Sequence, residues 1–189
     1  MAKVKREPRE LMVIRSEQIT TNMHRVTLGG EGMRNFPQDY AGGYVKFRFF
    51  NSELEKPITR TYSIRNQREN EIDVDFVLHG ENGGPASRWA ISCKAGDNIL
   101  VGGPGPKTML NHDMDWFLLI GDMTALPAIS VNLQQLPPNA IGYIVIEIID
   151  ESDIQLLTVP EKMEIKWLVN HNPGEKPNLL VNYVRDLAW

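Results

Sequence analysis

The spacing of apolar residues changes midway along the chain, and this change constrains the fold more than any other feature. Up to about residue 108, short segments alternate apolar with polar residues, most clearly over 44–50 and 72–79, and glycines separate them. Such alternation is typical of antiparallel strands with one buried face. From Trp116 to Ile120 the chain is continuously apolar, as in a buried parallel strand, and a helical pattern follows through Leu133. The sequence therefore predicts two architectures in succession.

These two architectures define two predicted domains. Residues 1–112 are predicted to form an antiparallel β-barrel, and residues 113–189 an α/β parallel-sheet domain with further buried strands at 142–149 and 165–169. A helix is predicted from Asn178, which can cap it, to Leu187. Because a crossover helix normally delivers the chain to another parallel strand, we expect the α/β domain to be truncated at its C-terminus.

Composition narrows the class of protein. The 189 residues are 42% hydrophobic and 23% charged, with a formal net charge of -4, which fits a globular chain and disfavours a nucleic-acid partner. Cys93 is the single cysteine, so no internal disulfide forms, and the charged segment 2–7 is unlike a secretory signal. The apolar runs at 116–120 and 144–149 are far shorter than the roughly 20 residues that span a bilayer. A cytoplasmic protein without a membrane span is expected.

The segment Arg60-Thr61-Tyr62-Ser63-Ile64-Arg65 is the first with chemical content. In an extended conformation, Arg60, Tyr62 and Ile64 share one side of the strand. A flat redox ring needs an aromatic group to stack on, a hydroxyl for its edge and cations for attached phosphates, and this segment offers all three. Taken alone, it is equally compatible with an exposed strand that carries two surface arginines.

The second informative segment runs from His79 to Ala90, where glycines precede a predicted helix start with Pro85 in its first turn. Free backbone N–H groups at a helix start bind anions, and glycine lets the backbone approach a pyrophosphate closely. Ser87 adds a hydroxyl. An ordinary turn is the simpler explanation of this segment alone, because it matches neither the Walker pattern nor the dinucleotide fingerprint.

Other candidate residues have structural explanations. Cys93 is expected to be a small buried residue, and Trp89 and Trp167 are expected to belong to the core. His79 at a strand end is as compatible with a structural role as with a ligand contact. The histidines are scattered without metal-ligand spacing, so no metal site is predicted.

Four ordered stretches together closely resemble the siderophore-interacting proteins, a family of FAD-dependent ferric-siderophore reductases of the ferredoxin-reductase type. The resemblance runs from about Arg9 to Trp189. The stretches are Arg60–Arg65, Asp73–Gly80, Gly84–Ala90 and Gly121–Ile129.

The resemblance implies an FAD site built by both domains. Arg60, Thr61, Tyr62 and Ser63 would hold the isoalloxazine and its surroundings, with Arg65 adjacent. The remaining implied contacts are Gly84, Ala86 and Ser87 at the pyrophosphate, Val77 and His79 along the cavity, and Thr124 and Ala125 closing over the flavin. Met123 stands where the family commonly has an acidic residue, and the family's final strands with their Gly-Glu motif are absent, which leaves the reductant site open.

The implied reaction is reduction of a ferric siderophore by reduced FAD, with NAD(P)H or ferredoxin as electron donor. Fe(II) binds hard oxygen donors less strongly than Fe(III), so reduction releases the metal. No side chain is assigned as a catalytic acid or base, because the protein's task is to position and tune the flavin.

Substrate recognition is predicted on the strand at 44–50, where Lys46 and Arg48 share a face and would attract anionic ferric chelates. A solvated surface explains these two cations equally well. Two alternative functions stay open: a flavin reductase or electron-transfer protein for another acceptor, and a module that binds an iron chelate without reducing it.

Overall fold

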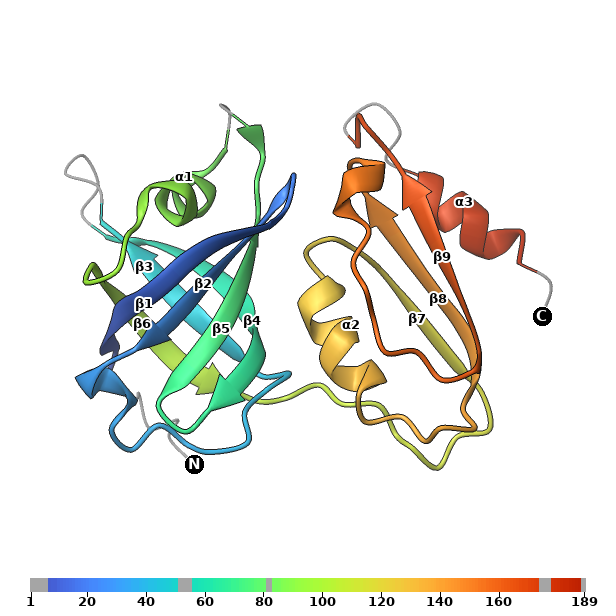
Figure 1. Cartoon of the computed structure of the whole chain (residues 1–189), viewed down its shortest axis with the longest axis horizontal. Helices are drawn as coiled ribbons and strands as arrows, with labels where there is room; N and C mark the ends of the chain where they lie inside the picture. Colours follow the sequence, from blue (N-terminus) through green and yellow to red (C-terminus); the bar gives the residue numbers. More distant parts are fainter. Residues whose placement is uncertain (1–6, 51–55, 81–82, 174–177, 188–189) are drawn as a thin grey trace.

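The computed structural model describes residues 7–50, 56–80, 83–173 and 178–187. The chain folds into two lobes that lie side by side, a β-barrel and a three-stranded sheet with helices (Figure 1). The connection between them runs from Pro106 to Trp116, the stretch in which the predicted domain division falls. Among the described residues, no helix is both long and apolar enough to cross a membrane.

The first lobe is a closed antiparallel barrel, as the alternating pattern predicts. Its strands pair in the order β1-β2-β5-β4-β3-β6. On β3 the predicted alternation holds, because Val45, Phe47 and Phe49 are buried while Lys46 is exposed. The bounds are β1 Arg9–Thr20, β2 Met23–Gly29, β3 Tyr44–Phe49, β4 Ile58–Arg68, β5 Glu71–Val77 and β6 Asn98–Gly105.

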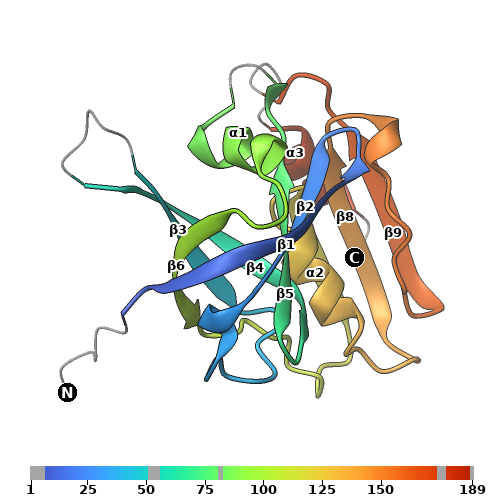
Figure 2. The same cartoon turned by 60° about the vertical axis from the view of Figure 1, so that its left-hand side comes forward.

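Helix α1 (Pro85–Ser92) lies against one end of the barrel, where it packs on an aromatic core (Figures 1 and 2). The Trp89 ring lies 5.6 Å from Phe47 and 5.7 Å from Phe76, centroid to centroid. Pro85 occupies the first turn, where its missing N–H costs nothing. The expectation that Trp89 belongs to the core is thus confirmed, although its side chain is only partly buried.

Strand β5 differs from its prediction as a half-buried strand. Every residue from Ile72 to Val77 is buried, including Asp73 and Asp75 on the outward face. Arginine side chains from the neighbouring strands β2 and β4 pair with these carboxylates. Alternation correctly identified the apolar inner face, but it gave no sign that ion pairs would cover the outer one.

The second lobe is a parallel sheet in the order β7-β8-β9, with α2 between this sheet and the barrel and α3 on the opposite face (Figure 1). Of the three predicted buried strands, only β8 is buried along most of its length. The flanking strands β7 and β9 are more accessible, and Ile120 on β7 is 40% exposed. The bounds are β7 Phe117–Asp122, α2 Leu126–Leu133, β8 Ile141–Ile148, β9 Lys162–Val169 and α3 Leu179–Arg185.

Helix α3 confirms the predicted C-terminal helix but not its cap. Asn178 occupies the N-cap position, yet its side chain makes no hydrogen bond to the helix start. The described helix is also shorter at both ends than the predicted segment.

A buried carboxylate joins the two lobes. Asp153, which follows β8 in a short 3-10 turn (Glu151–Asp153), is 0% exposed. Its Oδ1 accepts hydrogen bonds from Thr20 Oγ1 at 2.7 Å and from the Asn22 backbone N–H at 2.8 Å. Its Oδ2 accepts from Asn22 Nδ2 at 2.8 Å and from the Asp150 N–H at 3.1 Å. The tip of the β1–β2 hairpin is thereby held against the sheet lobe.

We predict that Asp153→Ala destabilises the protein by about 3 kcal/mol, because partly buried donors that were bonded to a charged, buried acceptor lose their partner. Urea unfolding followed by tryptophan fluorescence measures this change. The control is Glu151→Ala in the same turn, where the side chain is exposed and the free energy of unfolding should stay within about 0.5 kcal/mol of the parent. Equal stability of the two variants would contradict the role of Asp153.

Candidate flavin and substrate site

A cavity of about 250 Å³ lies where the two lobes meet. Four successive residues of β4 form one wall, and the start of α2 closes the opposite side. The lining residues are Arg60, Thr61, Tyr62, Ser63, Asp75, Val77, His79, Thr124 and Pro127. This space therefore brings together four residues of the first segment singled out by the sequence, His79 from the start of the second segment, and the segment after β7.

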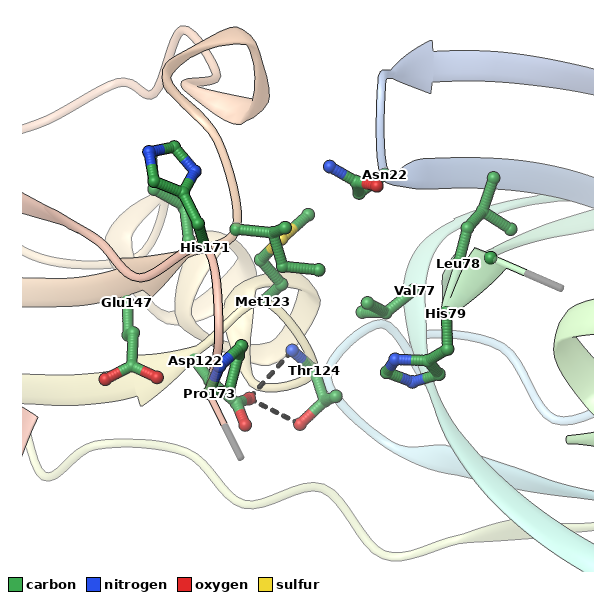
Figure 3. Close-up of a pocket in the computed structure, with 13 residues that line it drawn as sticks. Asn22, Val77, Leu78, His79, Asp122, Met123, Thr124, Glu147, His171 and Pro173 are labelled. Carbon is green, nitrogen blue, oxygen red and sulfur yellow. Dashed lines mark hydrogen bonds between the residues drawn. The ribbon is translucent and has the colours of Figure 1, made fainter. Parts of the chain in front are cut away.

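A second cavity, of about 520 Å³, adjoins the first and shares Val77, His79 and Thr124 with it. It extends along the carboxyl ends of β7 and β8 and reaches Glu147 and His171 on the far side (Figure 3). Ligands of open parallel sheets bind outside the carboxyl ends of the strands. The larger cavity has that position.

Some predicted site residues line neither of these two cavities. Within the described part of the chain, seven of the twelve predicted cofactor residues line the smaller cavity, and Asp75 and Pro127 line it without having been predicted. Asp75 is one of the polar residues in the alternating pattern of β5, so the alternation alone could have marked it as a candidate site residue. The residues outside the lining are Arg65, Gly84, Ala86, Ser87 and Ala125.

Tyr62 is a fixed aromatic surface in the smaller cavity. Its ring meets Phe47 edge-on, with centroids 5.5 Å apart, and lies 4.3 Å from Phe76. Burial raises the pKa of the Tyr62 hydroxyl, and the charge of Arg60 opposes this only in part. The phenol therefore stays neutral near pH 7 and can both stack and hydrogen-bond.

The turn after β7 positions Thr124. Asp122 Oδ1 accepts hydrogen bonds from the Thr124 backbone N–H at 2.8 Å and from Thr124 Oγ1 at 2.5 Å. A Cβ at Gly121 would collide with the Cβ of Ala125, so glycine allows this turn to fold back on the strand. Ala125 consequently packs toward β7, which explains why it lines neither cavity.

The predicted anion site at the start of α1 is open only in part. Gly84 is exposed, and a Cβ there would meet nothing within 4 Å. Ala86 and Ser87 are buried, and Ser87 Oγ accepts a hydrogen bond from the His79 N–H at 3.4 Å. The Ser87 hydroxyl thus faces the end of β5 and links the start of the second informative segment to its helix. The predicted segment also includes residues 81–82, which lie outside the described residues.

Ion pairs stiffen the barrel wall behind the cavity. Arg25 donates from Nε to Asp75 Oδ1 at 2.6 Å and from Nη2 to Oδ2 at 2.8 Å, and Arg65 Nε lies 4.0 Å from the same carboxylate. Arg68 forms an equivalent pair with Asp73 at 2.6 and 2.8 Å. Arg65 lies at the lobe interface, where it lines a small pocket together with residues of α2 and of the segment 156–158.

The electrostatics of Asp73 reflect two opposing causes. Burial alone would raise the pKa of this carboxyl group, but hydrogen bonds from Arg68 and Thr27, with the nearby guanidinium charges, bring the pKa below its ordinary value. The carboxylate therefore stays charged in the wall of the barrel.

Neither of the two predicted substrate cations is in the lining of the smaller cavity. Lys46 is the register partner of Thr61, so the two side chains share the outer face of the barrel. Lys46 Nζ lies 5.7 Å from the centre of the Tyr44 ring. Arg48, next along that face, lines a separate groove with Phe50.

The remaining expectations concern metals and Cys93. In the described ranges, no group of three or more metal-ligating side chains is arranged to hold an ion. Cys93 is buried, as predicted, and burial raises the pKa of its thiol. Neither feature adds a reactive side chain to the cavities.

Comparison of the chain with known proteins identifies its family. A family described as "Siderophore-interacting FAD-binding domain" matches residues 12–57 and 50–108, and one described as "Siderophore-interacting protein" matches residues 114–189. The chain belongs to the siderophore-interacting protein family. It is 35% identical to the ferric vibriobactin reductase ViuB of Vibrio cholerae over 199 residues, which cover 95% of this chain and 73% of that protein.

More distant comparisons agree with this membership. The NADPH-dependent ferric-chelate reductase of Escherichia coli is 26% identical over 183 residues, covering 86% of this chain and 71% of that protein. The crystal structure of the siderophore-interacting protein SipS from Aeromonas hydrophila has a TM-score of 0.84 and 32% identity over 97% of this chain and 75% of that one. The ferredoxin-NADP+ reductase of Plasmodium falciparum shares the fold alone, with a TM-score of 0.65 and 19% identity over 95% of this chain and 76% of that one. The fold is thus ferredoxin-reductase-like, as the resemblance implied.

The Asp73 network generates a prediction about acid stability. Asp73→Asn should lower the free energy of unfolding at pH 7 by about 2 kcal/mol, because it weakens hydrogen bonds to charged partners. The native pKa lies below the ordinary 3.8. The stabilisation by the carboxylate is therefore complete above about pH 4 and is lost as the pH falls through the native pKa.

Urea titrations of both proteins at pH 7 and pH 3 measure this difference, which should be smaller at pH 3. Asp113→Asn, on the exposed connection between the lobes, is the matched control and should have little effect at either pH. A difference that grows toward acid would contradict the assignment.

Proposed function

We propose that this family member is an FAD-dependent reductase of ferric siderophores that releases iron as Fe(II) in the cytoplasm. The observation that carries the proposal is the convergence of Arg60–Ser63, His79 and Thr124 on one cavity between the lobes. The aromatic, hydroxyl and guanidinium groups gathered there are those that a flavin needs. The match to an FAD-binding family and the ferric-reductase names of two relatives support the proposal.

The residues at the cavity fit FAD in their chemistry. Tyr62 offers a neutral ring with a fixed orientation, and Ser63 and Arg60 offer a hydroxyl and a cation beside it. The exposed Gly84 at the start of α1 leaves the backbone N–H groups of the first turn open to a pyrophosphate. We assign the ring to Arg60–Ser63 and the pyrophosphate to the start of α1, with Ala86 and the buried Ser87 fixing that turn.

The protein's part in the reaction is to bind, orient and shield. When bound and reduced, the flavin would supply two electrons, enough to reduce two Fe(III) ions, and the weaker affinity of Fe(II) for oxygen ligands would release the iron. Tyr62 holds the plane of the ring, Thr124 closes it from the sheet lobe, and Lys46 faces the approaching chelate. This reduction needs no catalytic acid or base from the protein.

We assign binding of the electron donor to the larger cavity. Its position at the carboxyl ends of β7 and β8, next to the flavin cavity, suits a nicotinamide nucleotide. The Escherichia coli relative is named for NADPH. Reduction by a ferredoxin is the other candidate for the donor, and a binding module that lacks redox activity is the alternative outside enzymes.

The first test concerns the cofactor. Heat-released cofactor should be FAD rather than FMN, because the start of α1 offers a second anchor that only a pyrophosphate requires. Arg60→Ala should weaken FAD binding by about 10- to 150-fold, since a charge-assisted hydrogen bond is worth about 1.5–3 kcal/mol. Fluorescence titration of apoprotein measures the affinity.

Arg185→Ala on the remote helix α3 is the charge-matched control and should bind FAD normally. Recovery of FMN alone, or a colourless protein that takes up no FAD, would contradict the proposal. Unchanged affinity of the Arg60 variant would remove Arg60 from the site.

The second test concerns the substrate and its charge. Photoreduced protein should be reoxidised anaerobically by an anionic ferric siderophore, and the rate should fall between 0.01 and 0.15 M salt. Over that range the Debye length shrinks from about 30 Å to about 8 Å, which screens attraction by Lys46 and Arg48. A neutral ferric chelate should respond much less.

Lys46→Ala and Arg48→Ala should reduce both the rate at low salt and its salt dependence. Lys162→Ala at the start of β9, on the sheet lobe, is the control for a general loss of positive charge. No reoxidation by any ferric chelate would contradict the proposed function. Equal salt responses for both chelates would remove only the two cations from substrate recognition.

A further inference from the structure

The distribution of charge along the larger cavity bears on the identity of the electron donor. At the end shared with the flavin cavity lie His79 and Thr124, and the opposite end is formed by Glu147 on β8 and His171 after β9 (Figure 3). Among the described residues that line it, none is Lys or Arg. A nucleotide whose nicotinamide reaches the flavin would therefore extend its adenosine half toward carboxylates.

Glu147 is the carboxylate best placed to contact that half. It is the register partner of Asp122, so the two acidic side chains lie on one face at the carboxyl ends of adjacent strands. Asp122 is occupied by the turn that holds Thr124. Glu147 Oε1 accepts one hydrogen bond from Asn170 Nδ2 at 3.1 Å, which fixes the carboxylate and leaves it capacity to accept more.

The next carboxylates along the chain have structural roles. Asp150 Oδ1 accepts hydrogen bonds from the backbone N–H and the hydroxyl of Ser152, and these bonds lower the pKa of Asp150. Asp153 joins the lobes. Both add negative charge at this edge of the sheet, but Glu147 is the one that lines the cavity.

We propose that Glu147 selects NADH over NADPH as the reductant of the flavin, an inference that rests on the proposed function. The 2′-hydroxyl of the adenosine ribose in NADH can donate a hydrogen bond to a carboxylate, as in other dinucleotide sites at strand ends. The 2′-phosphate of NADPH brings about two further negative charges to the same place, next to Glu147 and Asp122, and the described lining residues include no Lys or Arg to pair with it. In the reaction NADH and a proton reduce FAD to FADH2, and NAD+ leaves.

The test compares the two nucleotides on one preparation. Anaerobic bleaching of the flavin absorbance at pH 8, where histidine side chains ordinarily carry no charge, gives a second-order rate constant for each nucleotide. We expect NADH to be at least about tenfold faster, and Glu147→Gln to lower the NADH-to-NADPH ratio at least about fivefold. Glutamine can still accept the hydrogen bond from Asn170, and the ratio cancels differences in folding or flavin content.

Glu164→Gln, which removes an exposed charge earlier on β9, is the matched control and should leave the ratio unchanged. Equal or faster reduction by NADPH, or a ratio that Glu147→Gln does not change, would overturn the inference. The inference would also be overturned if neither nucleotide reduced the flavin of a protein that, after photoreduction, still reduces the ferric chelate. Failure of the photoreduced protein to reduce any chelate would instead contradict the proposed function.

Discussion

The junction of the two lobes is held by hydrogen bonds to one buried carboxylate. Asp153 accepts hydrogen bonds from the β1–β2 hairpin of the barrel and from its own turn after β8. Both cavities are formed by residues from both lobes, so their shape depends on this junction. A hydrogen-bonded charge suits this task because its acceptor directions fix orientation, which apolar contacts between the lobes specify less strictly.

A second constraint acts within the barrel, where polar groups stiffen the wall that carries the candidate ring-binding residues. Asp73 and Asp75 are buried with arginine partners on adjacent strands, and Arg65 reaches Asp75 from β4 itself. Each strand beside the cavity is therefore tied to its neighbour by side chains as well as by backbone hydrogen bonds. Tyr62 is fixed from the inside by Phe47 and Phe76, so both faces of β4 resist displacement.

The local pattern of residues was sufficient to predict much of the fold. The alternation on β3, the proline at the first turn of α1 and the apolar run into α2 are each properties of a few consecutive residues, and the structure confirms all three elements. Four predicted positions on β4 line the cavity because a strand keeps its residues in sequence order. Hydrogen-bond partners that are distant in the sequence could not be predicted: nothing around Asp153 indicates that it would bond to Asn22, 131 residues away. Similarly, the outer face of β5 reads as solvated because its arginine partners come from other strands.

Under the proposed function, the burial of Cys93 has a chemical consequence. Reduced flavins react with dioxygen to give peroxide, which oxidises thiolates far faster than thiols. Cys93 is the single cysteine of the chain, is 8% exposed and has a pKa raised by burial, so it presents peroxide with little thiolate and little access. Burial would thereby keep the Cys93 thiol apart from the proposed electron transfer at the lobe interface, and peroxide formed by air oxidation of the flavin would not modify the barrel covalently at this residue.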